Sequence, residues 1–471
     1  MAIDVLVIGA GLSGLVSAYR AKRAGLSVAV FEARPKPGGV IGSERRAGAL
    51  FERGPNSGLD TTPLINAMLA DLGIAAERVD GSKASSKRYV VRGGRLVALP
   101  MSPGAFLRTP LFSFGAKLRL FAEPFIRKAP ADAEESIARF VRRRLGEEFL
   151  DYAIEPFVAG IYAGDPETLS VPAAFPRLHA LEQRYGGLIK GAIMGARERR
   201  KNADKSKNAA SSFSFREGMQ TLTDALARAV GNVECEVRVT RVERRPDGSF
   251  VVAGERFGMA FERAARAVVV ATPAYAASEL VRDLAPAAAT ALGDIPYPPV
   301  TVVASAYRRR EILHPLDGFG FLAPAKERPA VLGTLFSSTM FENRAPSEVA
   351  VLTTFVGGRR NPELATAGDA EVRNGVQAEL ARLVGAGAEP MWSEITRWSR
   401  AIPQYTLGHL GRIAKVEEAE RAVPGLYFCA NYRGGVSIGD CVKAGHAIAE
   451  RVAARLGRPG EPVAQPGAVV G

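Results

Sequence analysis

The first 31 residues are the part of this chain that most restricts its fold. An apolar, β-branched run at residues 3–9 (IDVLVIG) predicts a buried strand, and a helix is expected from about Ser13 to Ala24 after a glycine-rich turn. Gly25 ends that helix, and residues 26–31 (LSVAVF) predict a second strand. A strand, a turn, a helix and a strand within about thirty residues form a βαβ unit, whose two strands lie parallel in one sheet.

The turn has the glycine spacing of a nucleotide-phosphate site. Gly9 permits the tight turn out of the strand, Gly11 lets the backbone approach a pyrophosphate, and Gly14 lets the helix pack closely on the strand. The pyrophosphate is expected on the free N–H groups of the helix N-terminus. Glu32 ends the second strand about 20 residues further on, where an acid accepts hydrogen bonds from ribose hydroxyls. The expected contacts in the turn are Gly9, Ala10, Gly11, Leu12, Ser13 and Gly14.

The rest of the chain is long enough for further domains. With 471 residues it exceeds what one hydrophobic core usually holds, so two or three domains are expected. Residues 60–220 are expected to be mostly helical, with strand-like runs at 88–91 and 96–99. A final helix from about Asp440 to Leu456 follows a strand and a glycine pair, which repeats the N-terminal pattern and predicts a return to the first domain. The other expected strands are residues 233–242, 250–253, 267–271, 300–307, 331–335, 350–356 and 425–430.

Composition limits the partners. The net charge is +13, yet the densest basic run, residues 197–207, lacks interleaved aromatics and any known nucleic-acid module. A solvated loop is therefore expected there, with attraction to an anionic membrane surface as the alternative, and no nucleic acid is expected as a partner. Three cysteines without metal-ligand spacing and four scattered histidines predict reduced thiols and no metal site. Because no basic segment precedes the apolar start and no apolar run of about 18 residues occurs, a cytosolic chain is expected.

The continuation after Glu32 favours a flavin over a nicotinamide dinucleotide. Residues 32–39 (EARPKPGG) add a second glycine pair, which allows another close approach of the backbone. An NAD dehydrogenase would instead continue into further βαβ units. This pattern, with residues 268–274 (VVVATPA) and residues 425–445 (GLYFCANYRGGVSIGDCVKAG), resembles the FAD-dependent amine oxidases and their relatives. The resemblance implies FAD held without a covalent bond.

Strings outside the FAD segments resemble the protoporphyrinogen oxidase subfamily almost from end to end. The resemblance implies oxidation of protoporphyrinogen IX to protoporphyrin IX in haem (porphyrin) biosynthesis: six hydrogens leave in three flavin-mediated steps, and dioxygen becomes hydrogen peroxide. A related activity on coproporphyrinogen III, giving coproporphyrin III, is the nearest alternative. Amine oxidases, carotenoid desaturases and a non-catalytic flavoprotein are the more distant ones. The matching strings are residues 51–57 (FERGPNS), 87–100 (KRYVVRGGRLVALP), 135–169, 295–300 (IPYPPV), 318–324 (GFGFLAP), 333–338 (GTLFSS) and 402–409 (IPQYTLGH).

A porphyrinogen is a large apolar macrocycle with propionates at one edge, so it needs an apolar slot with a cation at the rim. By resemblance, Arg88 pairs with a propionate, which a guanidinium binds through two parallel hydrogen bonds. No histidine, cysteine or carboxylate pair stands at the matched positions as a base, so hydride transfer to FAD is expected to depend on positioning. The other substrate positions implied by resemblance are Asn56, Gly160, Leu322, Leu335 and Phe355.

For the cofactor, the resemblance adds positions far from the Rossmann turn. The helix after Ser437 and Ile438 is expected to direct its N-terminus at the flavin and to stabilise negative charge on it. The backbone of Val239 is expected to meet the adenine. The full set of added positions is Ala33, Gly39, Val40, Gly54, Pro55, Asn56, Ser57, Val239, Trp398, Val436, Ser437 and Ile438.

The predicted architecture is an α/β fold with a discontinuous Rossmann-type FAD domain, an antiparallel-sheet substrate domain and a helical domain that rests on a membrane. The resemblance also implies a homodimer attached peripherally to the inner face of the cell membrane. The expected boundaries are residues 1–85 with 210–285 and 410–460 for the FAD domain, 86–209 for the helical domain, 286–409 for the sheet domain, and 461–471 for a flexible tail.

Overall fold

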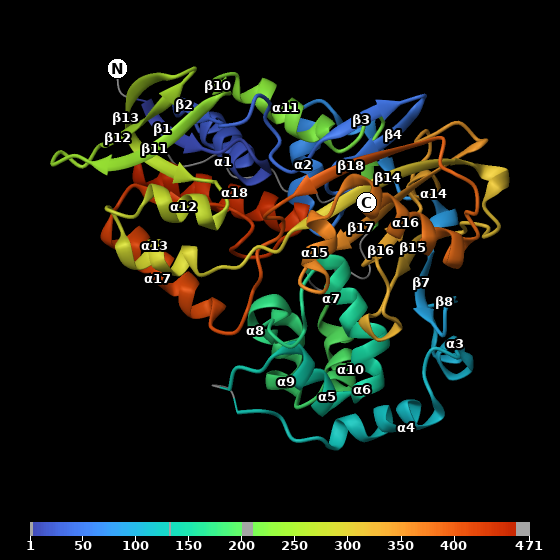
Figure 1. The fold of residues 1–471 in the computed structure, drawn as a ribbon. Helices are drawn as coiled ribbons and strands as arrows, with labels where there is room; N and C mark the ends of the chain where they lie inside the picture. Colours follow the sequence, from blue (N-terminus) through green and yellow to red (C-terminus); the bar gives the residue numbers. More distant parts are fainter. Residues whose placement is uncertain (1–2, 131–132, 200–210, 458–471) are drawn as a thin grey trace, which may run out of the picture.

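In the computed structural model, residues 3–130, 133–199 and 211–457 are described (Figure 1). The tail expected at residues 461–471 lies outside these ranges, as does most of the basic run at residues 197–207.

The first sheet is built from both ends and the middle of the chain. Strand β1 pairs in parallel with β2 on one side and with β13 on the other, and β19 near the C-terminus pairs in parallel with β13. This confirms the expected βαβ unit and the return of the last segment to the first domain. The strands, in the order β10-β2-β1-β13-β12-β11 with β19 beside β13, are β10 Val233–Glu234, β2 Val28–Phe31, β1 Ile3–Ile8, β13 Met259–Val270, β12 Phe250–Arg256, β11 Val237–Arg244 and β19 Leu426–Phe428.

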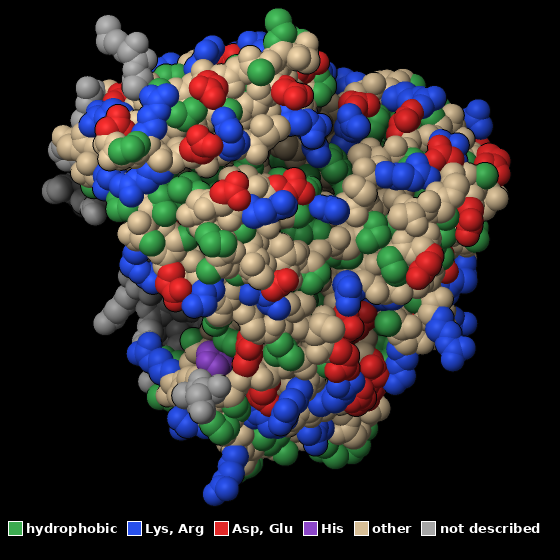
Figure 2. Space-filling view, turned by 60° about the vertical axis from the view of Figure 1, so that its left-hand side comes forward, with side chains coloured by type: hydrophobic (Ala, Val, Ile, Leu, Met, Phe, Trp, Pro, Cys, Tyr) green, Lys and Arg blue, Asp and Glu red, His purple; other side chains and the backbone are tan. Residues whose placement is uncertain are grey.

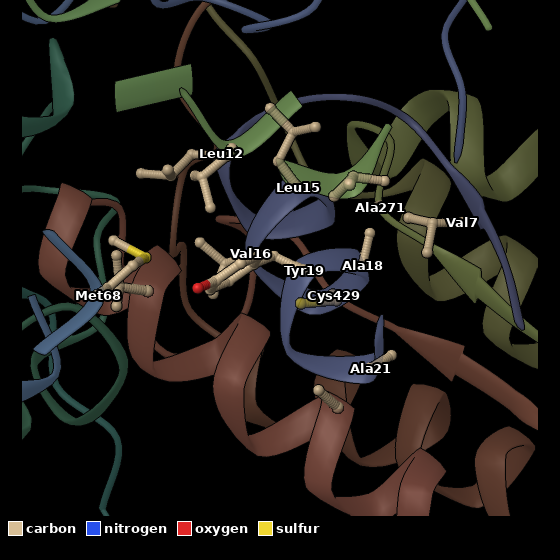
Figure 3. Packing of buried hydrophobic residues seen from close by; sticks show 14 of the residues in the cluster. Val7, Leu12, Leu15, Val16, Ala18, Tyr19, Ala21, Met68, Ala271 and Cys429 are labelled. Atoms are coloured by element: carbon tan, nitrogen blue, oxygen red, sulfur yellow. The ribbon is translucent and has the colours of Figure 1, made fainter. Parts of the chain in front are cut away.

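Helix α1 (Leu12–Arg23) is buried between this sheet and helix α18 (Ile438–Arg455), and Figure 3 shows its side chains packed among Val7, Ala271 and Cys429. The approach of the two helices is close, because a Cβ on Gly445 would lie 2.8 Å from the carbonyl oxygen of Ser13. Helices α2 (Pro63–Asp71) and α11 (Gln220–Val230) complete this layer. The opposite face of the sheet is covered by α12 Ala274–Leu280, α13 Pro286–Gly293 and α17 His409–Ala422.

The second sheet is antiparallel except for one parallel pair, β7 with β15. Five of its seven strands were expected, whereas β15 and β18 were not, because glycines interrupt the first and polar residues alternate through the second. The hairpin at residues 87–98 extends this sheet, and helix α16 (Asp369–Val384) covers one of its faces. The strands, in spatial order, are β18 Trp392–Trp398, β14 Val300–Arg308, β17 Val349–Gly357, β16 Gly333–Leu335, β15 Gly318–Leu322, β7 Lys87–Arg92 and β8 Arg95–Ala98.

The helical segment forms the lower end of the molecule in Figure 1. Inside it, Arg144 is fully buried and paired with Glu123 and Glu182, so the charges of this small core satisfy one another. None of the helices in the described part of the chain has the length and apolar character needed to cross a bilayer. The helices are α3 Pro103–Arg108, α4 Phe114–Ala122, α5 Ile137–Arg144, α6 Glu147–Phe149, α7 Glu155–Tyr162, α8 Val171–Ala174, α9 Pro176–Tyr185 and α10 Leu188–Arg199, with a π-turn η4 at Leu150–Ile154.

Short elements connect these layers. They are the hairpin β3 Ser43–Arg46 and β4 Ala49–Glu52, the small sheet of β5 Gly58–Leu59, β9 Ser212–Phe215 and β6 Arg78–Asp80, the helices α14 Ser337–Met340 and α15 Pro362–Thr366, and the 3-10 turns η1 Ala75–Glu77, η2 Lys83–Ser85, η3 Glu123–Phe125, η5 Arg309–Glu311 and η6 Ala325–Glu327.

Candidate functional site: a dinucleotide cradle beside an apolar sheet face

The turn after β1 has the geometry of a phosphate cradle. Gly9 has φ +107°, and a Cβ there would lie 2.8 Å from the carbonyl oxygen of Ala271. A Cβ on Gly14 would lie 2.1 Å from the carbonyl oxygen of Gly9, whereas one on Gly11 would meet nothing within 4 Å. No side chain caps the N-terminus of α1. The amides of Leu12 and Ser13 therefore start a helix beside open space, as bound pyrophosphate requires.

Glu32 is buried and fixes the backbone around this turn. One carboxylate oxygen accepts a hydrogen bond from the amide of Ala10 (2.8 Å), and the other accepts one from the amide of Arg34 (2.9 Å). Ala33 lies between these two anchors. Each carboxylate oxygen can accept a further hydrogen bond, so the geometry is compatible with the ribose contact expected of Glu32. That contact stays a prediction.

The second glycine pair lies directly against the first glycine motif. Gly38 donates its N–H to the carbonyl of Ala10 (2.8 Å), and a Cβ on Gly39 would lie 3.2 Å from the Cα of Gly11. Gly39 has φ +62°, a backbone conformation that glycine adopts without strain. The two glycine motifs therefore form one continuous stretch of backbone, in which Gly9, Gly11 and Gly39 are partly exposed.

Trp398, at the end of β18 in the second sheet, lies beside the segment that carries the second glycine pair. The Arg34 guanidinium lies 5.2 Å from the centre of the Trp398 ring and donates to the carbonyl of Gly39 (2.9 Å). The Trp398 indole N–H donates to the carbonyl of Arg53 (2.8 Å). Val40 joins this group, because a Cβ on Gly54 would lie 2.2 Å from the carbonyl oxygen of Val40. Gly39, Val40, Gly54 and Trp398, predicted from distant parts of the chain, are thus brought together.

Asn56, with Pro55 and Ser57 beside it, joins the cradle to the second sheet. Its side-chain oxygen accepts a hydrogen bond from the Ser337 hydroxyl (3.1 Å), which also lies 2.8 Å from the Thr353 hydroxyl. The Asn56 side chain is buried, yet its Nδ2 has no partner among the described residues. A buried amide donor without an acceptor is costly unless a ligand supplies one, so this position fits a cofactor ring with acceptor atoms.

Helix α18 begins at the expected segment, directly after Ser437. Ser437 forms a capping box with Asp440, and the Ser437 amide donates to the Asp440 carboxylate (3.2 Å). The Ser437 amide is therefore already hydrogen-bonded inside the protein. Among the described residues, the amides of Ile438 and Gly439 have no partner, so these two remain for a ligand at the helix N-terminus. Val436 precedes them and packs on the core of the helical segment.

Val239 lies near the other end of the cradle. Just before it, the amide of Val237 donates to the carbonyl of Glu32 (2.9 Å), and the amide of Glu236 donates to that of Arg34 (3.1 Å). The ladder between β11 and β12 shifts register directly after Val239, which leaves the strand irregular at the expected adenine position.

The three apolar positions lie on one face of the second sheet. Leu322 pairs with Gly333, and Gly333 pairs with Phe355. Leu335 is two residues beyond Gly333 on β16, so its side chain points to the same face. All three are only partly buried, whereas their neighbours on the opposite face, such as Phe321, are fully enclosed. Together they form an apolar surface of a kind that suits a flat ligand.

Gly160 in α7 lies against this surface. A Cβ on Gly160 would come within 2.8 Å of a methyl group of Leu322, so the helix and the sheet are as close as a glycine allows. The end of α7 is held by the amide of Arg359, which donates to the carbonyl of Ala163 (2.8 Å). Gly160 and Leu322, predicted separately, are therefore neighbours.

Arg88 lies on the same side of the sheet. Val90 pairs with Leu322, and Arg88 is two residues earlier on the same strand. Its guanidinium lies 5.4 Å from the Phe319 ring and has no carboxylate partner among the described residues. By contrast, Lys87 is paired with Asp317, and Arg92 is paired with Glu148. Arg88 is thus an exposed, unpaired cation at the edge of an apolar face.

Sequence reasoning missed the polar residues that hold this site together. Ser337, Thr353 and Arg344 link Asn56 to the second sheet, and Tyr405 holds the loop before α18. Ser337 and Tyr405 lie in the matching strings at residues 333–338 and 402–409, so the strings were the available signal. Within the described residues, no His, Cys, Asp and Glu side chains cluster in a way that could hold a metal, and the three cysteines form no disulfide.

Comparisons with known proteins agree with this geometry. Residues 12–453 match the family described as flavin containing amine oxidoreductase. The chain is 35% identical to a mitochondrial protoporphyrinogen oxidase of Nicotiana tabacum, over 96% of this chain and 95% of the relative. It is 27% identical to a coproporphyrinogen III oxidase of Bacillus subtilis, over 94% and 96% of the two chains.

Solved structures show the same fold. A protein of Exiguobacterium sp. 255-15, provisionally described as a protoporphyrinogen oxidase, superposes with a TM-score of 0.82 at 23% identity, covering 97% of this chain and 99% of the other. A redesigned putrescine oxidase gives a TM-score of 0.69 at 19% identity over 96% and 99%. The cradle, the matched family and the conserved length lead to one conclusion: the chain belongs to the flavin-containing amine oxidoreductases, with FAD as its cofactor, and within them to the group of the protoporphyrinogen oxidases.

Proposed function

We propose that this protein oxidises protoporphyrinogen IX to protoporphyrin IX in haem biosynthesis, with dioxygen as the electron acceptor. The observation that carries the proposal is the apolar face of Leu322, Leu335 and Phe355 with the unpaired Arg88 at its edge. A porphyrinogen has the matching chemistry, namely an apolar macrocycle and propionates at one side. The Nicotiana tabacum relative described above is a protoporphyrinogen oxidase according to its name.

In this reaction the side chains of the protein position rather than transform the substrate. FAD, held without a covalent bond, supplies a two-electron acceptor in each of three steps, and three dioxygen molecules become three hydrogen peroxide molecules. Leu322, Leu335 and Phe355 exclude water from the macrocycle, and Arg88 fixes its orientation through a propionate. Asn56 stands between the apolar face and the cofactor cradle, with both N–H groups of its side-chain amide left to donate.

The test uses the fluorescence of the product. Purified protein with FAD, mixed in air with protoporphyrinogen IX, is expected to form fluorescent porphyrin and hydrogen peroxide in a ratio of one to three. The second candidate substrate is coproporphyrinogen III, favoured by the full-length similarity to the Bacillus subtilis relative. Comparing kcat/KM on the two porphyrinogens decides between them, and we expect the higher value with protoporphyrinogen IX. A yellow protein that forms porphyrin from neither would contradict both.

We further propose that the helical segment rests on the inner face of the cell membrane. Large apolar side chains of α4 and η3 are exposed, among them Phe114 (76%), Phe121 (69%) and Phe125 (87%). In Figure 2, hydrophobic and basic side chains lie side by side at the lower end of the molecule, where Figure 1 places α4. An apolar helix face next to cations suits the surface of an anionic bilayer.

Co-sedimentation with vesicles tests this placement. The protein is expected to bind vesicles that contain anionic lipid, and the double variant Phe121→Asp/Phe125→Asp is expected to stay in the supernatant while its flavin spectrum is unchanged. Equal binding of both proteins would contradict the placement.

A homodimer is part of the same proposal, and sedimentation velocity of the detergent-free protein checks it, because a mass of 50.1 kDa would mean a monomer.

A further inference from the structure

The loop between β19 and α18 is held by two side chains from a distant turn. The Tyr405 hydroxyl donates to the carbonyl of Asn431 (2.7 Å) and accepts from the amide of Gly435 (3.0 Å). His409 Nε2 lies 2.9 Å from the carbonyl oxygen of Tyr432, so this nitrogen carries the proton and donates it. Three backbone groups of one short loop are thus bound to one pair of rings.

The two side chains are buried, and their rings are stacked. The Tyr405 and His409 side chains belong to residues that are each 2% exposed, and their rings stack with centres 4.1 Å apart and planes 13° apart. Burial raises the pKa of the Tyr405 hydroxyl well above 10, so at neutral pH it keeps the proton it donates. Burial lowers the pKa of His409 to about 4, so the imidazole is neutral. Neither ring brings a charge to the loop.

The turn that carries the pair is itself anchored to two other parts of the molecule. The amide of Gln404 donates to the carbonyl of Pro296 (2.9 Å), and the carbonyl of Tyr405 accepts from the amide of Ser170 (2.8 Å). The amide of Leu407 donates to the carbonyl of Thr168 (3.0 Å). The Tyr405 hydroxyl therefore projects from a fixed base, and this can set the position of a loop that glycines would otherwise leave free.

The loop needs such a support. Gly434 and Gly435 have φ +80° and +125°. Because glycine also adopts negative φ values without strain, these two residues do not by themselves hold the loop in one conformation. Directly after them, Val436 and Ile438 lead into the N-terminus of α18, where two amides remain for the cofactor. A shift of the loop would move these donors, and electrostatic stabilisation depends on donors that are already in place.

We propose that Tyr405 is a positioning residue for the flavin: its hydroxyl orders the loop 431–436 and so places the amides of α18 before FAD binds. The inference rests on the proposed position of the flavin at Val436–Ile438. It is tested on FAD binding without porphyrinogen, so its failure is distinguishable from the absence of porphyrin formation by the wild-type protein.

The experiment compares two tyrosine-to-phenylalanine variants. Tyr405→Phe removes only the hydroxyl that binds the loop. Tyr162→Phe is the matched control, because Tyr162 is also buried, its ring lies 5.7 Å from that of Tyr405, and its hydroxyl donates to the carbonyl of Ala174 (3.2 Å) rather than to the loop. FAD is titrated into each flavin-free protein, and the midpoint potential of the bound flavin is measured.

Tyr405→Phe is expected to raise the dissociation constant of FAD at least about fivefold more than Tyr162→Phe does, as the loss of a buried hydrogen bond predicts. It is also expected to move the midpoint potential to a more negative value, while Tyr162→Phe leaves the potential unchanged. A smaller difference in affinity, or equal potentials in the two variants, would overturn the proposal and leave Tyr405 with a packing role.

A measurement on the wild-type protein covers the case that Tyr405→Phe does not fold. Hydrogen exchange of a peptide spanning residues 430–437 is followed with and without FAD. If Tyr405 orders the loop in advance, the Gly435 amide is protected already in the flavin-free protein. Protection that appears only after FAD is added would mean that the cofactor orders the loop, and the proposal would be wrong.

Discussion

Arg344 Nη1 lies 2.8 Å from Glu52 Oε1, and the two side chains are 2% and 0% exposed. Glu52 ends β4, and Arg344 lies between α14 and β17, so the ion pair joins the β3–β4 hairpin to the second sheet. Arg344 also reaches the carbonyl of Asn56 (3.4 Å). Burial raises the pKa of Glu52, and Arg344 opposes that rise by stabilising the carboxylate. Each partner is therefore tolerated inside the protein only because the other is present.

This pair predicts a large loss of stability when one partner is removed. Arg344→Met leaves the buried Glu52 carboxylate without its cation and is expected to lower the free energy of unfolding by about 3–5 kcal/mol. The free energy of unfolding of the double variant Glu52→Gln/Arg344→Met is expected to fall less than that of Arg344→Met alone. Urea denaturation measures both. Arg45→Met is the control, since its exposed pair with Glu217 should contribute less than about 1 kcal/mol. A double variant as unstable as the single one would contradict the pairing argument.

Replacing Gly11 by alanine is expected to weaken FAD binding, whereas replacing Gly14 by alanine is expected to lower the stability of the protein. A Cβ on Gly11 meets no protein atom within 4 Å, so Gly11→Ala should leave the flavin-free protein as stable as before. The methyl group would occupy space meant for the pyrophosphate, so the dissociation constant of FAD should rise more than about tenfold. Titration of FAD combined with thermal unfolding of the flavin-free protein separates these effects.

Gly14→Ala should instead destabilise the protein before any cofactor binds, by about 1–3 kcal/mol, because its Cβ would overlap the carbonyl oxygen of Gly9 at 2.1 Å. If the two variants lose stability equally, the space beside Gly11 is not the cofactor site.

Arg88→Ala is expected to raise KM for the porphyrinogen about ten- to a hundredfold, with a much smaller change in kcat, because it removes a charged hydrogen bond that orients the substrate. Arg88→Lys should recover part of the affinity, since the charge remains but the paired geometry is lost. Arg95→Ala, an exposed arginine on the neighbouring strand β8, is the control and should leave KM unchanged. An unchanged KM in Arg88→Ala would exclude this arginine as the propionate anchor.

Gly160→Ala tests the apolar slot. The new methyl group would lie 2.8 Å from a methyl of Leu322, and a flexible side-chain end can move away, so the fold should remain intact. The displaced Leu322 would narrow the slot, and KM is expected to rise about five- to tenfold. The double variant Gly160→Ala/Leu322→Ala should restore much of the loss in steady-state assays. If KM does not recover in the double variant, the effect of Gly160→Ala does not act through Leu322.

His409 predicts a defined effect of pH on stability. Its pKa is lowered to about 4 by burial, below the value near 6.5 of an exposed histidine, so between these values the unfolded chain binds the extra proton. The free energy of unfolding should therefore fall as pH drops from 6.5 to 4, by about 3 kcal/mol from this residue. His409→Gln should be less stable at pH 7 but flatter across that window, as urea titrations at several pH values would show. An equal slope in both proteins would contradict this assignment.

The nucleotide-binding half of the protein could be predicted because its signals are local. The strand at residues 3–9, the glycines at 9, 11 and 14, and the acid at 32 follow one another within a single βαβ unit, where spacing alone fixes geometry. The resemblance of the later strings added the flavin and a set of substrate positions, without distances between them.

Only the tertiary structure decided how those positions meet. Leu322 and Phe355 share a face because of strand register, and Gly160 touches Leu322 because α7 packs on that face; neither relation leaves a local pattern in the sequence. The same holds for Arg344, which looks like any surface arginine until the fold buries it against Glu52, and for Tyr405, whose hydroxyl meets a loop 30 residues further on. The sequence determined which backbone can hold a dinucleotide, because that depends on glycine at fixed spacing. The fold determined which side chains meet at the apolar face and beside the glycine motifs, because those contacts are made between segments far apart in the chain.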